Sequence, residues 1–505
     1  MIDLTLAQIA DIVGGQLTDI SAADAQHTFV TGTVEFDSRA VGAGGLFLAL
    51  PGARVDGHEH AQAAVAAGAV AVLAARPVGV PAIVVAPAAG STVEKDPASV
   101  LEHDRDGSGA AVLAALAKLA AAVAEQLVAG GLTIIGVTGS SGKTSTKDLL
   151  AAVLAPLGEV VAPPGSFNNE LGHPWTVLRA TPDTDYLILE MSARHKGNIA
   201  ALAAVAPPQI AVVLNVGTAH LGEFGSRQAI ADTKAELPQS VPESGVVVLN
   251  ADDSAVAAMA ELTSARVVRV SRENSRADVW ADAITLDELA RASFTLHCQD
   301  DDTIDIALAV HGDHQVSNAL CAAAVALECG ASGAQVAEAL AGAGPVSQHR
   351  MAVTTRTDGV TVVNDAYNAN PDSVRAGLAA LAWMARGGGR AENRRRSFAV
   401  LGEMGELGDD AISEHDRIGR LAVRLDVSRL VVVGTGRAMS AMHHGAVMEG
   451  SWGAEASQVD DVEAALALLR AELQPGDVVL VKASKSAGLV ALAQALTADG
   501  GDVRP

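Results

Sequence analysis

The residues best suited to chemistry form a short run rich in glycine and hydroxyl groups. The run Gly136-Val-Thr-Gly-Ser-Ser-Gly-Lys-Thr-Ser145 follows an apolar segment and precedes a helical pattern. Where such a loop opens a helix, its backbone amides can cradle phosphate oxygens. Lys143 can reach the β and γ phosphates, and the Thr144 hydroxyl can bind Mg²⁺. The residues expected to contact a nucleotide are Gly139, Ser140, Ser141, Gly142, Lys143, Thr144 and Ser145.

The spacing of this run differs from the standard phosphate-binding loop. In the pattern G-x-x-x-x-G-K-[ST], the first glycine would fall on Val137, whereas this loop reads G-x-x-G-K-T. The alternative is a glycine turn that carries a surface lysine. We favour the nucleotide loop because the strand, loop and helix signals agree in order and position.

Two further polar residues follow apolar runs later in the chain. Glu190 ends the run Tyr186–Glu190, and His220 follows the run at 210–214. The carboxyl ends of parallel strands meet at the edge where such sheets bind ligands. We therefore predict that Glu190 holds the metal of the nucleotide, with a salt-bridged edge residue as the alternative. His220 is expected either to bind the metal or to donate a hydrogen bond, although an isolated histidine more often does neither.

Positioning these residues requires a mostly parallel sheet covered by helices. After Gly131, apolar runs alternate with helical stretches, and the alternation restarts beyond Pro345 in a Rossmann-like pattern. The strand-like runs of the two regions are 132–137, 186–189, 210–214 and 246–249, then 360–363, 398–401, 430–433 and 478–481.

We therefore predict an α/β protein of three domains. The first spans 1–128 and includes a polar insertion at about 90–109. The second, 129–344, would be a P-loop ATPase-like domain, and the third, 345–505, a Rossmann-like domain. The cores of the first two domains look separate in the sequence, so a chain that begins near Gly131 is expected to fold.

The composition excludes several classes of protein. The chain has 505 residues, and 35 Lys and Arg against 59 Asp and Glu give a formal charge of −24. This charge disfavours a nucleic-acid binder or a polybasic membrane anchor. Three cysteines cannot form a disulfide framework, and no segment is expected to span a membrane. We expect a cytoplasmic protein.

In these motifs the chain resembles the Mur ligases, ATP-dependent amide-forming enzymes of peptidoglycan synthesis. Residues 138–144 look like their nucleotide loop, and 215–220 look like their central histidine motif. The resemblance implies that Lys234 becomes carbamylated and helps to hold a second Mg²⁺. It also implies that Glu190 and His220 bind metal. The residues that it adds to the ATP site are Asn318, Arg350 and Asp365.

Other motifs resemble the branch of this family that adds D-alanyl-D-alanine. The segment Asp365-Ala-Tyr-Asn-Ala-Asn-Pro-Asp-Ser373 is similar to a motif of that branch, as is the segment 165–174. The segments 37–39 and 56–58 are similar to its UDP-binding domain. The residues implied to bind substrate are Ser38, Arg39, Asn168, Asn169, Tyr367, Asn368 and Asn370.

Two positions depart from the family pattern. Ala483 stands where the family usually has glycine, and Glu223 lies one position later than the family's glutamate. Glu223 is therefore given no metal role.

The resemblance implies that the chain joins D-alanyl-D-alanine to UDP-N-acetylmuramoyl-tripeptide. Because a carboxylate is a poor electrophile, ATP would first convert it to an acyl phosphate, which the amine attacks to release phosphate. The products would be UDP-N-acetylmuramoyl-pentapeptide, ADP and phosphate. The expected cofactor is Mg²⁺, in two sites, and we expect a monomer without nucleic-acid partners or membrane insertion.

Two other functions remain open from the sequence. One is another ligase of the superfamily, either a sister Mur enzyme or a folylpolyglutamate synthase. The motif Tyr367–Pro371 and the separate domain before the nucleotide loop disfavour it. The other is a P-loop nucleotide-binding protein without ligase activity. A guanine-reading Asn-Lys-x-Asp motif would support it, but the nearest segment, Asn250–Asp253, lacks the lysine.

Overall fold

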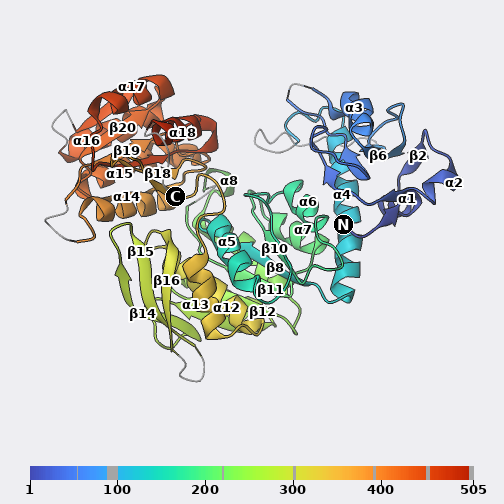
Figure 1. Cartoon of the computed structure of the whole chain (residues 1–505), viewed down its shortest axis with the longest axis horizontal. Coiled ribbons are helices and arrows are strands. Elements are labelled where there is room, and N and C mark those ends of the chain that lie inside the picture. Colours follow the sequence, from blue (N-terminus) through green and yellow to red (C-terminus); the bar gives the residue numbers. More distant parts are fainter. Residues whose placement is uncertain are drawn as a thin grey trace.

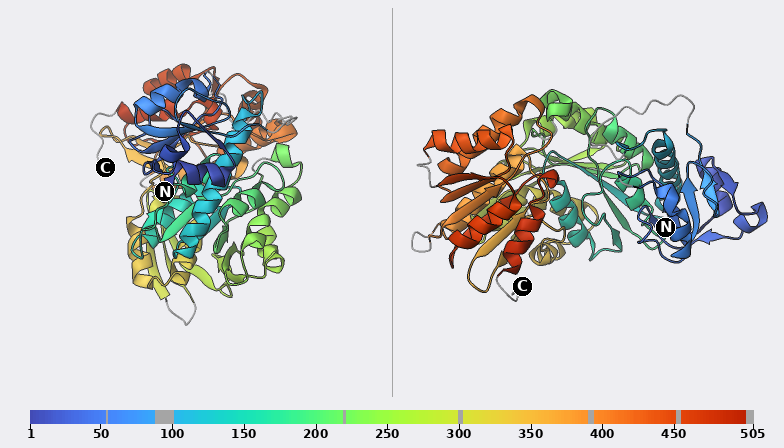
Figure 2. Two further views of the ribbon diagram at one scale, coloured as in Figure 1. Left: turned by 90° about the vertical axis from the view of Figure 1, so that its right-hand side faces the viewer. Right: turned by 90° about the horizontal axis from the view of Figure 1, so that it is seen from above.

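The computed structural model describes residues 1–53, 55–87, 101–218, 221–298, 303–389, 394–450 and 455–499. It confirms an α/β protein in which three sheets of five or more strands follow one another along the chain. Figure 1 shows the N-terminal part in blue, the central part in green and yellow, and the C-terminal part in orange and red. Figure 2 shows from above that the central part lies between the other two. The polar insertion expected at about 90–109 falls largely on 88–100, outside the described residues.

The N-terminal sheet has five strands in the order β2-β7-β6-β5-β4. All neighbouring pairs are parallel except β2 with β7, and β1 pairs with β3 apart from this sheet. The strands are β1 (Leu4–Thr5), β2 (Gln16–Thr18), β3 (Phe29–Val30), β4 (Val34–Glu35), β5 (Gly45–Leu48), β6 (Ala69–Ala74) and β7 (Ala82–Val84). The helices are α1 (Leu6–Val13), α2 (Ala22–Ala25), a 3-10 turn (Gly57–His60) and α3 (Ala61–Ala66).

Helix α4 (Ser108–Ala129) joins the first part of the chain to the second. By length and composition it could cross a membrane. Its apolar face is instead packed inside the protein, since Leu116, Leu119 and Val123 are fully buried. These side chains belong to one continuous core with α1 of the N-terminal part and with Val177 of the central part. The expectation of separate cores is therefore wrong, because α4 fills the space between the two sheets.

The central sheet has nine strands in the order β16-β15-β14-β13-β12-β11-β8-β10-β9. The strands from β9 to β14 run parallel, and β15 and β16 extend the sheet as antiparallel strands. The strands are β8 (Thr133–Thr138), β9 (Val160–Val161), β10 (Tyr186–Glu190), β11 (Ile210–Val213), β12 (Val246–Asn250), β13 (Arg266–Ser271), β14 (Val279–Leu286), β15 (Arg291–His297) and β16 (Thr303–His311).

Helices cover both faces of the central sheet. One face carries α5 with α12 and α13, which share a core with Ile135, Val137 and Ile188 of the strands. The helices are α5 (Lys143–Leu154), α6 (Gly172–Val177), α7 (Asn198–Val205), α8 (Leu221–Phe224), α9 (Arg227–Lys234), α10 (Glu236–Ser240), α11 (Ser254–Ala257), a 3-10 turn (Ala258–Leu262), α12 (Gln315–Glu328) and α13 (Gly333–Gly342). The four strand-like runs expected in this region coincide with β8, β10, β11 and β12.

The C-terminal sheet has six strands in the order β17-β18-β22-β19-β20-β21, all parallel except β17. Each face has its own apolar core, one around Leu378 and Ile418 and the other around Leu469 and Leu492. The strands are β17 (Ala352–Thr355), β18 (Thr361–Asp365), β19 (Ser397–Leu401), β20 (Arg429–Val433), β21 (Ala456–Val459) and β22 (Val478–Lys482). The helices are α14 (Pro371–Ala385), α15 (Ala411–Arg424), α16 (Arg437–Glu449), α17 (Val462–Glu472) and α18 (Val490–Ala498), with 3-10 turns at Gly408–Asp410 and Lys485–Ala487.

A tryptophan lies at each junction between neighbouring parts. Trp175 Nε1 donates to Val34 O at 2.8 Å and so joins α6 to the N-terminal sheet. At the other junction, Trp383 Nε1 of α14 donates to Asp287 O at 2.8 Å, just beyond β14. Figure 1 shows α14 above the ends of β14 and β15. Side-chain hydrogen bonds therefore join the central part to both of its neighbours.

Candidate active site

The expected nucleotide loop lies between β8 and α5, as the sequence predicted. Gly142 precedes α5 with φ at 83°, a left-handed conformation that favours glycine. A Cβ at this position would also lie 2.6 Å from Asn318 Oδ1, so no larger residue fits. Asn318, on α12, therefore packs directly against the loop, next to residues 139–145, where the resemblance had placed it.

Asn215 holds the first half of the loop. Its Oδ1 accepts from the amides of Ser140 at 3.0 Å and Ser141 at 2.9 Å, and its Nδ2 donates to Ser141 O at 3.2 Å. The amides of Ser140 and Ser141 thus point to a side chain of the neighbouring loop. From the sequence, Asn215 belongs to a motif (215–220) but has no assigned role, because its contact with the loop depends on how β11 pairs with β8.

Lys143 is the cation of the loop. Its Nζ donates to Gly139 O at 2.6 Å, so the side chain folds back over the loop. Burial lowers the pKa of Lys143, the charge of Glu190 opposes this shift, and Arg350 adds to it. The ammonium therefore lies among the groups that are expected to surround the phosphates.

Glu190 is completely buried at the carboxyl end of β10. Its Oε2 accepts from Thr144 Oγ1 at 3.3 Å, Ser166 Oγ at 3.1 Å and Asn168 Nδ2 at 3.3 Å. Its Oε1 is buried and has no hydrogen-bond partner. Across the described ranges the carboxylate forms no ion pair, which disfavours the alternative of a salt-bridged edge residue.

The residues around Glu190 fit a magnesium ion. A buried carboxylate oxygen without a partner is costly, and Mg²⁺ prefers carboxylate and hydroxyl oxygens. Thr144 Oγ1 supplies the hydroxyl beside it. His220 lies outside the described residues. Within those residues no group of three or more His, Cys, Asp and Glu side chains could hold a metal. The further ligand that the family resemblance implies is Lys234 in its carbamylated form.

Lys234 ends helix α9 and is 5% exposed. A lysine on a helix is usually solvated, but this one has no hydrogen-bond or ion-pair partner among the residues that the structure describes. Burial holds the pKa of Lys234 well below its usual range, and the charge of Lys143 lowers it further. The neutral amine that carbamylation requires is therefore favoured at this position.

The C-terminal part contributes Arg350. Its Nη2 donates to Thr144 Oγ1 at 3.4 Å, and its guanidinium lies 4.2 Å from the centre of the Tyr367 ring. The flanking residues His349 and Met351 have φ of 60° and 48°, a left-handed backbone that L-residues rarely adopt. Such strain persists only where the surrounding structure holds it. Arg350 is thus held in a strained turn against the nucleotide loop.

Asp365 and Lys482 form a buried ion pair behind this turn. Asp365 Oδ1 accepts from the amide of Met351 at 3.2 Å, and Lys482 Nζ also donates to Asn368 O at 3.0 Å. Burial lowers the pKa of Lys482, while Asp365 opposes the shift. Asp365 therefore fixes the Arg350 turn to the segment that holds Tyr367 and Asn368.

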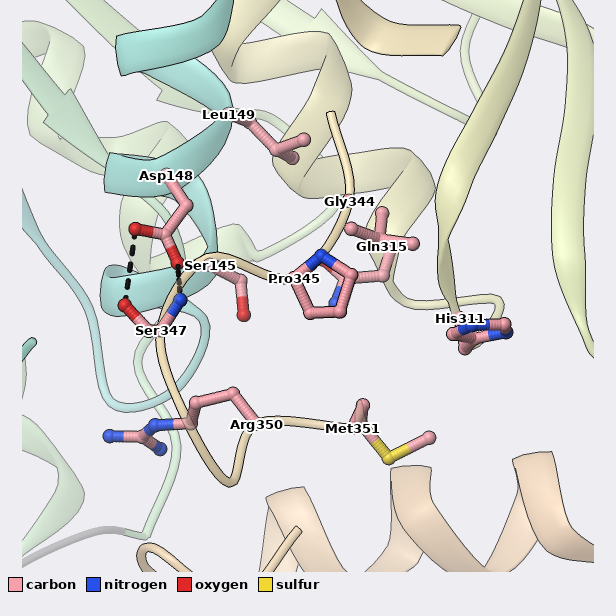
Figure 3. Close-up of a pocket in the computed structure, with 11 residues that line it drawn as sticks. Ser145, Asp148, Leu149, His311, Gln315, Gly344, Pro345, Ser347, Arg350 and Met351 are labelled. Carbon is pink, nitrogen blue, oxygen red and sulfur yellow. Dashed lines mark hydrogen bonds between the residues drawn. The ribbon is translucent and has the colours of Figure 1, made fainter. Parts of the chain in front are cut away.

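The linker before Arg350 is held by hydrogen bonds from Ser347 to Asp148, a contact that we call the linker latch. Figure 3 shows Ser347 beside Asp148, in a pocket that also contains Ser145 and Gln315. Asp148 accepts from the amide of Ser347 at 3.0 Å and from its Oγ at 3.1 Å. Lys147, almost fully buried, forms an ion pair with Asp148 at 2.6 Å. The sequence offered no signal for this latch, since its partners are 199 positions apart.

The residues implied to bind substrate fall into two groups. In the first, Asn168 contacts Glu190 and Asn169 accepts from the amide of Gly172 at 2.9 Å. The rings of Phe36 and Phe167 lie 6.3 Å apart, which brings this segment beside the segment of Ser38 and Arg39.

Ser38 is half-buried and Arg39 is exposed. Arg39 forms an ion pair with Asp37 at 2.7 Å and lowers the pKa of Asp37 to about 2.

The second group lies before α14. Tyr367 stacks under Arg350, and Asn368 Oδ1 accepts from the amide of Ala369 at 2.9 Å. Asn370 caps α14 and donates from Nδ2 to Ser140 O at 3.3 Å. Asn370 therefore contacts the nucleotide loop directly. The C-terminal part thus lies against the loop through both Arg350 and Asn370.

Three family models match the chain. They are the Mur ligase family catalytic domain over residues 32–122, the Mur ligase middle domain over 137–326, and the Mur ligase glutamate ligase domain over 349–485. The UDP-N-acetylmuramoyl-tripeptide–D-alanyl-D-alanine ligase of Mycobacterium tuberculosis is 74% identical over the full length of both chains. That of Escherichia coli is 32% identical over 99% of this chain and 100% of the other.

Solved structures agree with these relatives. A crystal structure of MurF from Acinetobacter baumannii has a TM-score of 0.79 at 28% identity, with 98% of this chain and 99% of that chain covered. MurF ligase from Thermotoga maritima in complex with ADP has a TM-score of 0.72 at 26% identity, with 93% and 97% covered.

Proposed function

Because the chain belongs to the Mur ligase family, we infer that it joins D-alanyl-D-alanine to UDP-N-acetylmuramoyl-tripeptide. It is an ATP-dependent ligase of peptidoglycan synthesis, and ATP is its co-substrate. The observation that carries this conclusion is the 74% identity, across the whole chain, to UDP-N-acetylmuramoyl-tripeptide–D-alanyl-D-alanine ligases of mycobacteria. The nucleotide loop, which includes Lys143 and lies beside Glu190, is where we expect phosphoryl transfer to occur.

The reaction needs a carboxylate to become an electrophile. Transfer of the γ-phosphoryl group of ATP to the tripeptide carboxylate gives an acyl phosphate, and the amine of D-alanyl-D-alanine then displaces phosphate. Catalysis consists of holding the groups together and neutralising the charge that develops. We propose that Lys143 and Arg350 supply the positive charge that neutralises the phosphates. Lys143 folds over the nucleotide loop, and Arg350 donates to Thr144 Oγ1.

We propose that Thr144, Glu190, His220 and carbamylated Lys234 hold Mg²⁺, in two sites. The unpartnered Oε1 of Glu190 and the burial of Lys234, which lowers the pKa of its amine, support this proposal. When bound, the metal neutralises phosphate charge. Glu190 keeps its carboxylate in place through the hydrogen bonds from Thr144, Ser166 and Asn168.

We propose that the substrates lie across the three domains, 1–128, 129–344 and 345–505. Ser38 and Arg39 would bind the UDP part, with Asn168 and Asn169 beside them on the central domain. Tyr367, Asn368 and Asn370 would lie near the incoming dipeptide, supported by their position next to the nucleotide loop. We also propose a cytoplasmic monomer.

A phosphate-release assay tests the substrate. The purified chain receives ATP, Mg²⁺ and UDP-N-acetylmuramoyl-tripeptide, with either diaminopimelate or lysine as the third residue, and a panel of amino acids and dipeptides. We expect phosphate release with D-alanyl-D-alanine and none with L-alanine, D-glutamate or diaminopimelate alone. Lys143→Ala is the inactive control. Release with a single amino acid and a shorter UDP-peptide would instead identify a sister ligase.

A further inference from the structure

The N-terminus of α14 docks onto the central domain at two points, one on the nucleotide loop and one on the neighbouring loop 214–218. Asn370 Nδ2 donates to Ser140 O at 3.3 Å. Two residues further on, Asp372 Oδ2 accepts from the amide of Thr218 at 3.0 Å and from its Oγ1 at 3.3 Å. Both contacts join the C-terminal domain to the central domain. Within the part of the chain that the structure describes, Asp372 makes no hydrogen bond to the nucleotide loop, so its effect on that loop must pass through Thr218.

Thr218 belongs to the loop 214–218, which also holds the nucleotide loop. Gly217 N donates to Ser140 Oγ at 2.9 Å, and Asn215 binds the Ser140 and Ser141 amides. The approach of Asp372 is so close that a Cβ on Gly217 would lie 2.2 Å from its Oδ2. A displacement of Thr218 therefore reaches Ser140 through its immediate neighbour in the chain.

Asp372 is also held by residues of its own domain. Its Oδ1 accepts from Arg375 Nη1 at 2.8 Å, and Arg375 Nη2 donates to Glu414 at 2.9 Å. Glu414 is buried on α15 and forms a second ion pair with Arg417. The Asp372 carboxylate is therefore oriented within its own domain. Docking onto Thr218 costs little conformational entropy, because the side chain is already held in place.

We propose that Asp372 is a positioning residue, through which docking of the C-terminal domain sets loop 214–218 and the nucleotide loop for phosphoryl transfer. We expect nucleotide binding to depend on it little, because among the described residues Asp372 makes no hydrogen bond to Lys143, Thr144 or Arg350. The proposal rests on the proposed ligase function and adds to it a contact by which one domain controls the geometry of another.

Kinetics and binding on the full chain test this proposal. Asp372→Ala is compared with Asp372→Asn, which keeps an acceptor for the Thr218 amide. Asp461→Ala is the matched control. Asp461 caps α17 in the same domain, and among the described residues its side chain accepts only from the amide of Ala464, at 2.8 Å. We measure kcat by phosphate release with D-alanyl-D-alanine, and the Kd of ADP by calorimetry.

Asp372→Ala should lower kcat by about tenfold, within the range typical of coupling between sites. The Kd of ADP should stay within about twofold, and Asp372→Asn should recover part of kcat. Asp461→Ala should match the wild type. An unchanged kcat in Asp372→Ala would overturn the proposal. A rise in the Kd of ADP large enough to explain the lower activity of Asp372→Ala would also overturn it, because Asp372 would then act on nucleotide binding.

Small-angle scattering provides a readout that does not depend on turnover. With ADP bound, Asp372→Ala should have a larger radius of gyration than the wild type, because its C-terminal domain docks less. An identical radius in the two proteins would contradict the proposal. Failure of the wild type to release phosphate would refute the ligase function alone, and the comparison of radii would still test the proposal. If Asp372→Ala does not fold, Asp372→Asn and Thr218→Val take its place in both measurements, with smaller effects in the same direction.

Discussion

The side chain of Lys234 is a buried amine whose pKa is lowered mainly by burial and then by Lys143. Lys234→Ala should lose most of the activity, since it removes a proposed metal ligand. Small carboxylic acids should partly restore turnover by occupying the emptied position. Phosphate release with and without added acetate measures both effects.

Lys234→Arg is the control for charge at this position. It keeps a permanent cation, which cannot be carbamylated and would repel Mg²⁺, so it should remain inactive with or without acetate. A fully active Lys234→Arg enzyme would show that this lysine has no metal role. Melting temperatures of Lys234→Ala and Lys234→Arg are measured in parallel, to show that their loss of activity does not come from unfolding.

His173 predicts a dependence of stability on pH. Its ring is fully buried, and neither nitrogen has a hydrogen-bond partner of normal geometry among the described residues. Burial lowers the pKa of His173 to about 4, and the backbone at Leu202 and Glu190 opposes this shift. Between pH 6.5 and 4 the unfolded chain therefore binds the proton that the folded chain excludes, so stability falls as the pH falls. The shift corresponds to about 3 kcal/mol, present above pH 6.5 and lost by about pH 4.

His173→Phe should remove this part of the acid sensitivity while changing little at pH 7, because neither ring nitrogen makes a hydrogen bond of normal geometry that would be lost. Urea unfolding at pH 7 and at pH 4.5 measures the difference. His444→Gln, at an exposed position, should behave as the wild type. Equal acid losses in His173→Phe and the wild type would contradict this explanation.

At the scale of single elements, helix α5 carries the latch that holds the linker to the C-terminal domain. Lys147 and Asp148 form an ion pair with side chains 3% and 12% exposed. Asp148→Ala leaves a buried ammonium without its counter-ion and removes two hydrogen bonds from Ser347, whose Oγ keeps only the bond from Lys147 Nζ at 3.2 Å. We therefore expect a loss of about 3 kcal/mol. Lys147→Met in the same chain should recover much of that loss. Thermal melting compares these variants with Asp183→Ala, an exposed control.

If Asp148→Ala and the double variant were equally unstable, the ion pair would not be the source of the loss. Limited proteolysis gives a second measurement. Cleavage near Ser347 should be faster in Asp148→Ala, because both hydrogen bonds from Ser347 to this carboxylate are removed.

The elements that the sequence predicts are those whose signals are local. The apolar run, glycine loop and helical pattern around Lys143 appear as β8, the loop and α5. Glu190 also ends its strand as expected. Contacts between distant segments could not be read in this way. Asn215 meets the loop only because β11 lies beside β8, and Asp372 meets Thr218 across 154 positions.

At the scale of the whole molecule, the N-terminal and central domains share one core through α4. A chain that begins at Gly131 should therefore be less stable than one that begins at Asp106, which keeps the helix. Without α4, Val177 and Leu178 of the central domain lose apolar contacts and meet water. Melting temperature and binding of a hydrophobic dye compare the two chains. Equal stability would restore the view that the two cores are separate.

The two tryptophans at the domain junctions have an optical consequence. The chain has four tryptophans and two tyrosines, so the fluorescence background is low. Trp175 bonds to Val34 O across one junction, and Trp383 bonds to Asp287 O across the other. When either outer domain moves, only the indole at that junction changes its hydrogen bond and exposure to water. With Trp175→Phe and Trp383→Phe as the paired variants, emission wavelength can follow the two movements separately in unlabelled protein.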